Sequence, residues 1–64
     1  MNLGEIGLII KDRRRQLNIN QQDLADLAEV NINPIVSVER GKGNPKLDTI
    51  IILCKVLVLE ISIN

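Results

Sequence analysis

The first two predicted helices cover residues 3–17 and 21–30, where apolar residues recur three or four positions apart. This spacing places the apolar side chains on one face of a helix, which can pack against the rest of the chain. Asn18 suits the end of the first helix, and Asn20 is a good N-cap for the second. The apolar residues are Leu3, Ile6, Ile10 and Leu17 in the first segment and Leu24, Leu27 and Ala28 in the second.

Residues 30–41, VNINPIVSVERG, predict a third short helix although they contain a proline. With Asn31 as the N-cap, Pro34 is the third helical residue, and amides of the first turn have no intrahelical acceptor to lose. The proline is therefore tolerable. We expect Asn31 to cap the amide of Asn33 instead, and Asn33 to be pushed from helical angles, which delays or frays the first turn. Gly41 then ends the helix.

The remaining chain predicts one more helix and a short strand. Residues 47–57, LDTIIILCKVL, are rich in β-branched residues and fit either a helix or a buried strand. Their length and Asp48 in the first turn favour a helix, whose apolar stripe is Leu47, Ile50, Cys54 and Leu57. Apolar and polar residues alternate over 59–64, which predicts a strand. We therefore expect a domain over residues 1–58 and a separate C-terminal strand over residues 59–64.

The length of the chain, 64 residues, allows one small domain. Such a domain buries only about 60% of the surface that its unfolded chain exposes, so it needs further stabilisation. The single cysteine, Cys54, forms no internal disulfide, and the lack of histidine leaves no zinc site, so we expect neither metal nor cofactor. The chain is also 45% hydrophobic, more than a small monomer hides easily, which favours oligomerisation.

The net charge is zero, but the charges are segregated along the chain. Basic residues gather in residues 11–15 and 40–46, whereas all charged residues of 23–39 are acidic. This distribution fits either a local basic face on a neutral protein or ordinary solvated charge. The chain has no aromatic residue. Single-strand binders usually stack bases on aromatic side chains, so any nucleic-acid target is expected to be a duplex.

Two other classes of protein are disfavoured. An enzyme needs groups that the chain lacks, since it has no histidine, two serines without a base partner and no carboxylate pair set in a pocket. A secreted or membrane protein is disfavoured because no signal segment is present, and the apolar run over 49–63 is short and interrupted by charges. We expect a soluble cytoplasmic protein.

Two short helices joined by a tight turn have the spacing of a helix-turn-helix. Residues 19–45, INQQDLADLAEVNINPIVSVERGKGNP, resemble the DNA-binding domain of the Cro and phage-repressor (XRE) family. The resemblance covers roughly residues 3–58. It implies an all-α, lambda-repressor-like domain of four to five helices that binds specific sequences of double-stranded DNA as a repressor. The family usually has glycine where Glu29 and Val58 stand, and neither of these side chains favours a positive φ.

The resemblance also implies roles for individual side chains. An Asn can bind adenine through two hydrogen bonds, and Ile or Val can pack on a thymine methyl group. The implied base contacts are Ile32, Asn33, Val36 and Ser37, and the implied phosphate contacts are Asn20, Gln21, Arg40, Lys42 and Asn44. Arg14 and Glu39 match positions that pair the first helix with the recognition helix. From the residues alone, the alternative for Gln21 is a solvated residue of the first turn. The alternative for Arg14 and Glu39 is two independent surface charges.

The tail, LEISIN, looks like the C-terminal strand of the HipB-type antitoxins, which pairs with its symmetry mate. A lone strand in a helical chain has unpaired backbone groups, and antiparallel pairing across a two-fold axis satisfies them. The expected interface of this homodimer is Leu57, Leu59, Ile61 and Ile63. These features predict the autorepressor of a toxin–antitoxin operon, bound to a palindromic operator and to a toxin. The alternatives are a phage or plasmid regulator without a toxin, or a protein-interaction module that has lost DNA binding.

Overall fold

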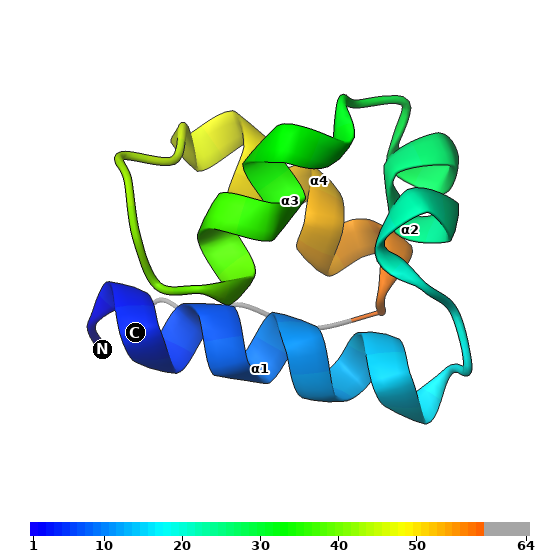
Figure 1. Cartoon of the computed structure of the whole chain (residues 1–64), viewed down its shortest axis with the longest axis horizontal. Coiled ribbons are helices and arrows are strands. Elements are labelled where there is room, and N and C mark those ends of the chain that lie inside the picture. The colour runs from blue at the N-terminus through cyan, green and yellow to red at the C-terminus, as the bar shows by residue number, and fades with distance from the viewer. Residues whose placement is uncertain (59–64) are drawn as a thin grey trace.

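The computed structural model describes residues 1–58, which form four helices and contain no strand (Figure 1). The helices are α1 (Leu3–Gln16), α2 (Gln21–Ala28), α3 (Ile32–Glu39) and α4 (Leu47–Val56). The all-helical expectation is confirmed for this part of the chain. The predicted strand over 59–64 and its pairing across a dimer lie outside the described residues.

The first two helices begin at asparagine caps that use their side chains. The Asn2 Oδ1 accepts a hydrogen bond from the Glu5 backbone N–H at 2.9 Å. At the start of α2, the Asn20 Oδ1 accepts from the Asp23 N–H at 2.7 Å, and the Asp23 carboxylate accepts from the Asn20 N–H at 3.0 Å. This reciprocal capping box satisfies two backbone donors that a helix start otherwise leaves without partners.

Helix α3 begins at Ile32, directly after Asn31, and Asn33 is helical. The expected delay of the first turn was therefore wrong. A helical proline clashes with the carbonyl four residues earlier, and for Pro34 that carbonyl belongs to Val30, which precedes the helix, so no helical hydrogen bond is lost there. The expected capping bond was also wrong, because the Asn31 side chain makes no bond to the first turn.

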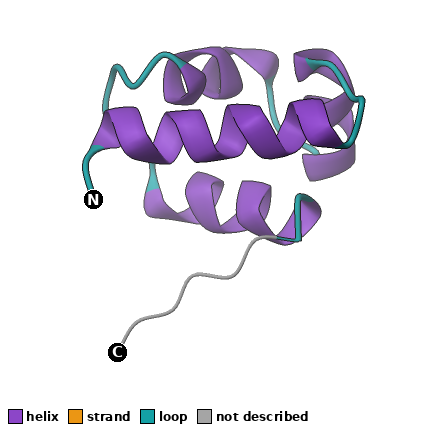
Figure 2. Cartoon of the chain, turned by 90° about the horizontal axis from the view of Figure 1, so that it is seen from below, coloured by secondary structure: helices purple, strands orange, loops and turns teal. Residues whose placement is uncertain are grey.

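The core lies where the four helices meet. In Figure 1, α1 runs along one side of the molecule, with α3 above it and α4 behind α3. Helix α3 packs against both α1 and α2, and α4 packs against α2. Figure 2, turned by 90°, shows the long helix α1 running across the front of the other helices. The buried apolar residues are Ile10, Leu24, Ala25, Ala28, Ile35, Val38, Ile50, Leu53, Cys54 and Leu57.

Four residues predicted for apolar helix faces lie on the surface instead, namely Leu3, Leu17, Leu27 and Leu47, and the last two are the most exposed. Leu27 is 62% exposed and Leu47 is 69% exposed. On α2 the inward face is set by Leu24 and Ala28, and Leu27 lies to one side of it. Leu47 is the first residue of α4 and follows an exposed loop, so it lies beyond the packed part of that helix.

The contact of α1 with α3 depends on a glycine. Gly7 is buried in α1, and a Cβ at this position would collide with the backbone carbonyl oxygen of Val38. Only a residue without a side chain allows α1 to approach the last turn of α3 so closely. This close contact fixes the position of the last turn of α3 relative to α1.

The backbone is left-handed at both positions where the family usually has glycine. Glu29 ends α2 with a φ of 57°, and Val58 follows α4 with a φ of 56°. Val58 is the more strained because its branched side chain crowds this conformation. The carbonyl of Leu57 beside it accepts a hydrogen bond from Arg13 Nε at 2.9 Å, which ties the end of α4 to α1. Over residues 1–58, every helix is too short or too polar to cross a membrane.

Candidate nucleic-acid interface

A buried ion pair holds the last turn of α3 against α1. Arg14 Nε and Nη2 donate to the two carboxylate oxygens of Glu39 at 2.7 and 2.9 Å. The side chains are only 10% and 3% exposed. Arg14 Nη1 also donates to the carbonyl of Ile19 at 2.9 Å, so one guanidinium joins α1, the turn before α2 and the end of α3. The hydrogen bond with Glu39 raises the pKa of Arg14 against the opposing effect of burial.

Gln21, the predicted phosphate anchor at the start of α2, belongs to the same network. Its Nε2 donates to the Oε1 of Glu39 at 3.2 Å. The sequence did not suggest this contact, because Gln21 and Glu39 are separated by the rest of α2, a turn and most of α3. Their meeting follows from the packing of α2 on α3, which residue types alone do not specify.

Asn20, also predicted to contact phosphate, is exposed, and its side-chain oxygen is already engaged in the capping box. The side-chain nitrogen of Asn20, in contrast to its backbone N–H, makes no hydrogen bond within residues 1–58 and can donate to an outside acceptor. Asn20 therefore combines a structural role with an open donor.

The four predicted base contacts divide into two pairs on α3. Asn33 and Ser37 are exposed, whereas Ile32 and Val36 are half-buried. Ile32 also packs against the core, so part of its surface is used within the chain. The inward positions of the helix are Ile35 and Val38, which are buried. The outward polar side of α3 is thus formed by Asn33 and Ser37, four residues apart on one face.

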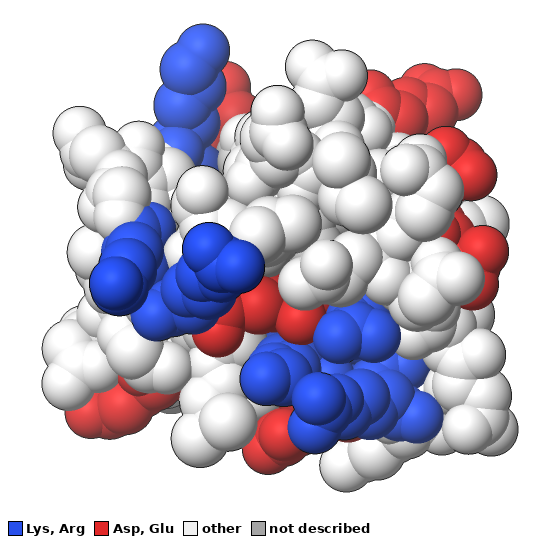
Figure 3. Space-filling view, viewed as in Figure 1, with Lys and Arg blue, Asp and Glu red and all other residues white. Residues whose placement is uncertain are grey.

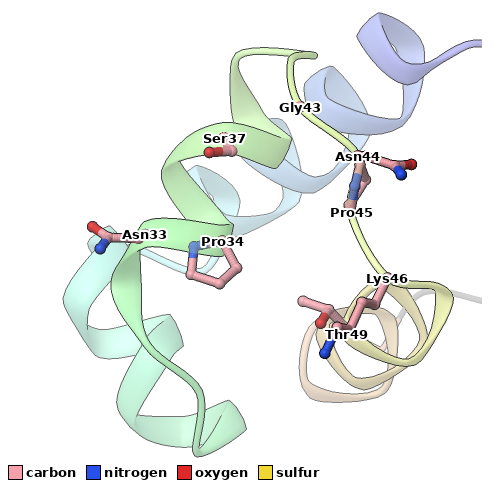
Figure 4. A pocket seen from close by; sticks show the side chains of 8 residues that line it. All are labelled: Asn33, Pro34, Ser37, Gly43, Asn44, Pro45, Lys46 and Thr49. Carbon is pink, nitrogen blue, oxygen red and sulfur yellow. The ribbon is translucent and has the colours of Figure 1, made fainter.

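A hollow of about 420 Å³ lies between α3, the following loop and the start of α4. Figure 4 shows the ring of Pro34 on α3 turned toward Lys46 and Thr49, whereas the polar ends of Asn33, Ser37 and Asn44 point away from the space between α3 and the loop. Asn33, Ser37 and Asn44 were predicted to contact DNA. The sequence did not predict a role in DNA contact for the other lining residues Pro34, Pro45, Lys46 and Thr49. The proximity of the GNPK loop to α3 could have suggested such a role.

The charged residues separate on the surface. In Figure 3, Lys and Arg side chains gather along part of α1, where acidic side chains also occur, and along the chain that follows α3, and an acidic group covers the side of α2. Arg40 and Lys42, two predicted phosphate contacts, are exposed just after α3. The exposed acidic residues of α2 and its end are Asp23, Asp26 and Glu29. The neutral chain therefore carries a basic side next to the outward face of α3.

The residues predicted for a dimer interface have different outcomes. Leu57 is fully buried in the core of the single chain, so it does not offer its side chain to a partner as expected. Its side chain belongs to the core cluster, and its backbone carbonyl accepts a hydrogen bond from Arg13 of α1 at 2.9 Å. Leu59, Ile61 and Ile63 lie outside the described residues. Exposed apolar side chains do occur nearby, at Ile52 and Val58.

Cys54 lies among the core residues of α4, as the sequence predicts, and burial raises the pKa of its thiol. A raised thiol pKa keeps the protonated, unreactive form at neutral pH. Within residues 1–58, every buried side-chain nitrogen and oxygen has a hydrogen-bond partner. The interior of the described domain therefore has a structural role, and the polar side chains that can bind a ligand lie on its surface.

Comparison with known families and structures agrees with this geometry. The model of the helix-turn-helix family HTH_3 matches residues 10–62. Among solved structures, the chain is similar to a mutant of the restriction-modification controller protein C.Esp1396I, with a TM-score of 0.81 and 24% sequence identity. The similarity covers 94% of this chain and 80% of that one. A comparison with curated proteins finds no match.

Proposed function

The chain belongs to the helix-turn-helix family HTH_3, a family of DNA-binding transcription regulators, and from this premise we propose that it represses transcription by binding a specific duplex sequence. The observation that carries the proposal is the outward face of α3. Asn33 and Ser37 are exposed there, next to the cations Arg40 and Lys42. A polar helix face bordered by cations suits base edges in a major groove and the phosphates beside it.

In this proposal α3 is the recognition helix. Asn33 binds a base edge through paired hydrogen bonds, and Ser37 donates or accepts one more. The half-buried Ile32 and Val36 contribute apolar contact with thymine methyl groups. Each good base contact distinguishes the correct base by roughly 1–3 kcal/mol.

The phosphate contacts are proposed to flank α3 on two sides. Asn20 and Gln21 lie at the start of α2, where a helix terminus favours an anion. Arg40, Lys42 and Asn44 lie on the other side, where Lys46 adds a further cation at the edge of the hollow. Cations that meet phosphates release condensed counterions, so the affinity for DNA depends on salt.

We propose further that the active form is a homodimer that pairs through Leu59, Ile61 and Ile63. The apolar composition of 59–64 and the exposed apolar side chains of Ile52 in α4 and Val58 after it support this role. A two-fold axis sets two copies of α3 side by side for successive major grooves of a palindromic site. Leu57 is not included, because it belongs to the core.

Two kinds of operon remain candidates. The tail LEISIN favours the autorepressor of a toxin–antitoxin operon, with a toxin as partner. The fold shared with a restriction-modification controller protein favours a regulator without a toxin. Copurification from the natural host distinguishes them: a stoichiometric partner supports the first, and the chain alone supports the second.

The proposal is tested by selecting bound sequences from a pool of random duplexes, followed by affinity measurements at several salt concentrations. Labelled DNA suits the measurement because the chain has no aromatic residue to report by fluorescence. We expect one enriched sequence and an affinity that falls steeply with salt. Arg40→Ala should weaken all sequences and flatten the salt slope by about one unit, whereas Asn33→Ala should relax the preference at one base step.

Lys55→Ala is the matched control for Arg40→Ala. Lys55 is an exposed cation in the last turn of α4, at the opposite end of that helix from the hollow, and its removal should leave the salt slope unchanged. Failure to enrich any duplex, or an affinity that ignores salt, would contradict DNA binding and favour a protein-interaction module on the same fold.

A further inference from the structure

Gln21 is the only side chain of α2 within the described residues that bonds to the buried Arg14–Glu39 pair. Its Nε2 lies 3.2 Å from the Oε1 of Glu39, whose side chain is 3% exposed. Gln21 itself is half-buried, so part of the residue remains accessible while its side-chain nitrogen contacts this buried carboxylate.

The chemistry of the pair fixes the orientation of this amide. An ionised carboxylate only accepts hydrogen bonds, so Gln21 must turn its NH2 group, not its carbonyl, toward Glu39. One N–H is then used by Glu39 and the second remains for another acceptor. A freely rotating glutamine would present oxygen and nitrogen alternately and would lose rotamer freedom on binding.

A carboxylate beneath a phosphate contact would ordinarily repel the DNA. Here Arg14 donates to both oxygens of Glu39, at 2.7 and 2.9 Å, and neutralises its charge. Glu39 can therefore orient a neutral donor without adding negative charge to the surface.

The neighbouring glutamine provides an internal contrast. Gln22 is exposed, and its Nε2 donates to the Oδ1 of Asp26 one turn later, at 2.9 Å. It has the same side chain one position away, and its bond is local and has no link to α3.

We propose that Glu39 is a positioning residue for DNA binding, which holds the Gln21 amide so that its second N–H meets a phosphate oxygen. The last turn of the recognition helix and the phosphate anchor at the start of α2 then act as one unit. This inference rests on the proposed function, because it requires a bound duplex.

The experiment uses the full chain and a set of selected duplexes, each with one phosphate replaced by an uncharged methylphosphonate. If Gln21 meets a phosphate, one replacement should weaken the wild type on the order of tenfold, the effect of one charge-assisted hydrogen bond. Gln21→Met should lose a similar factor on the unmodified duplex and be insensitive to that replacement. Its salt slope should stay unchanged, because Gln21 carries no charge and releases no counterion. Gln22→Met should behave as the wild type.

The role of Glu39 is separated from its structural role by the double variant Arg14→Met/Glu39→Met. Replacing both members of a buried ion pair by apolar side chains of similar volume often preserves the fold, which circular dichroism verifies. This variant should lose most of the sensitivity at the Gln21 phosphate and keep that at the phosphates of Arg40 and Lys42. A purely structural role of the pair would change all phosphates alike. If the double variant does not fold, the same phosphate sensitivities are measured for Glu39→Gln under conditions in which that variant is folded.

The other outcomes separate the two proposals. Sensitivity that is lost in Gln21→Met but intact without the Glu39 carboxylate overturns the positioning role. A duplex that binds without any phosphate depending on Gln21 overturns this inference and leaves the proposed function standing. Binding to no duplex overturns both.

Discussion

Helices α2 and α3 form the two halves of the helix-turn-helix, and they differ in whether a side chain caps their first turn. Each follows an asparagine N-cap in an extended conformation, with φ and ψ of −89° and 176° at Asn20 and −66° and 153° at Asn31. Asn20 caps the amide of Asp23, three residues later, whereas Asn31 makes no capping bond. The residue three positions after Asn31 is Pro34, which has no amide hydrogen.

The difference is caused by the residue whose backbone amide would be capped, and not by the asparagine itself. Asn2 at the start of α1 also bonds to the amide three residues later, that of Glu5. Where that position holds a proline, the same asparagine keeps its backbone angles and leaves its side chain free. Helix α2 is thus fixed at its start by its own residues, whereas α3 is fixed mainly at its end, through Glu39 and Arg14. Four predictions test this contrast.

The largest effect is expected from the anchor at the end of α3. Arg14→Met leaves the Glu39 carboxylate buried and without its charged partner, which should destabilise the fold by about 3 kcal/mol. A domain of this size has a total stability of roughly 3–10 kcal/mol, so this loss is a large fraction of the total and should lower the unfolding midpoint strongly. Denaturant titration followed by circular dichroism measures this.

Arg15→Met is the control for Arg14→Met, since Arg15 is the exposed neighbour on α1. Its effect should stay within about 0.5 kcal/mol. Equal effects of the two substitutions would mean that the pair does not anchor α3.

The two N-caps should respond differently to the same substitution. Asn20→Ala removes a capping box and should cost about 1 kcal/mol. Asn31→Ala removes a side chain that makes no capping bond and should cost only a few tenths. The comparison of the two unfolding midpoints is the measurement, and a loss at Asn31 as large as that at Asn20 would contradict the contrast.

The left-handed residues offer a smaller gain in stability. Val58→Gly should stabilise the chain by roughly 0.5–1 kcal/mol, because glycine adopts a φ of 56° without the crowding of a branched side chain. Glu29→Gly, in the turn between α2 and α3, should gain only a few tenths because Glu is unbranched at Cβ and strained less. A loss of stability in Val58→Gly would show that contacts of the valine outweigh its strain.

Residue patterns predicted much of this domain. Helix positions, the caps at Asn20 and Asn31, the end at Gly41 and the pairing of Arg14 with Glu39 all depend on local sequence or on a family motif. The exposure of Leu27 and Leu47 did not follow from periodicity, because it depends on where neighbouring helices end. Periodicity did place Leu57 on the apolar face of its helix, but it did not show that the core of the single chain buries this side chain completely. The bond between Gln21 and Glu39 is likewise a product of packing between helices.

The start of α3 shows why local rules failed there. The residue before a proline disfavours helical angles, which predicted a late helix, yet Asn33 is helical. That preference is modest, and the packing of Ile32 and Ile35 in the core outweighs it. Local rules rank conformations of an isolated segment, and burial of two apolar residues in one turn is enough to change the ranking.

The smallest effect concerns Pro34 itself and is measured as a coupling. Pro34→Thr restores an amide three residues after Asn31, so the asparagine side chain should then cap it as Asn20 caps Asp23. The gain is offset in part because threonine gives the unfolded chain more freedom than proline, and the net stability should rise by only a few tenths of a kcal/mol. The sharper measurement is Asn31→Ala in both backgrounds. It should cost almost nothing beside Pro34 and roughly 0.5 kcal/mol beside the threonine. Equal costs in the two backgrounds would mean that something other than the missing amide keeps Asn31 from capping α3.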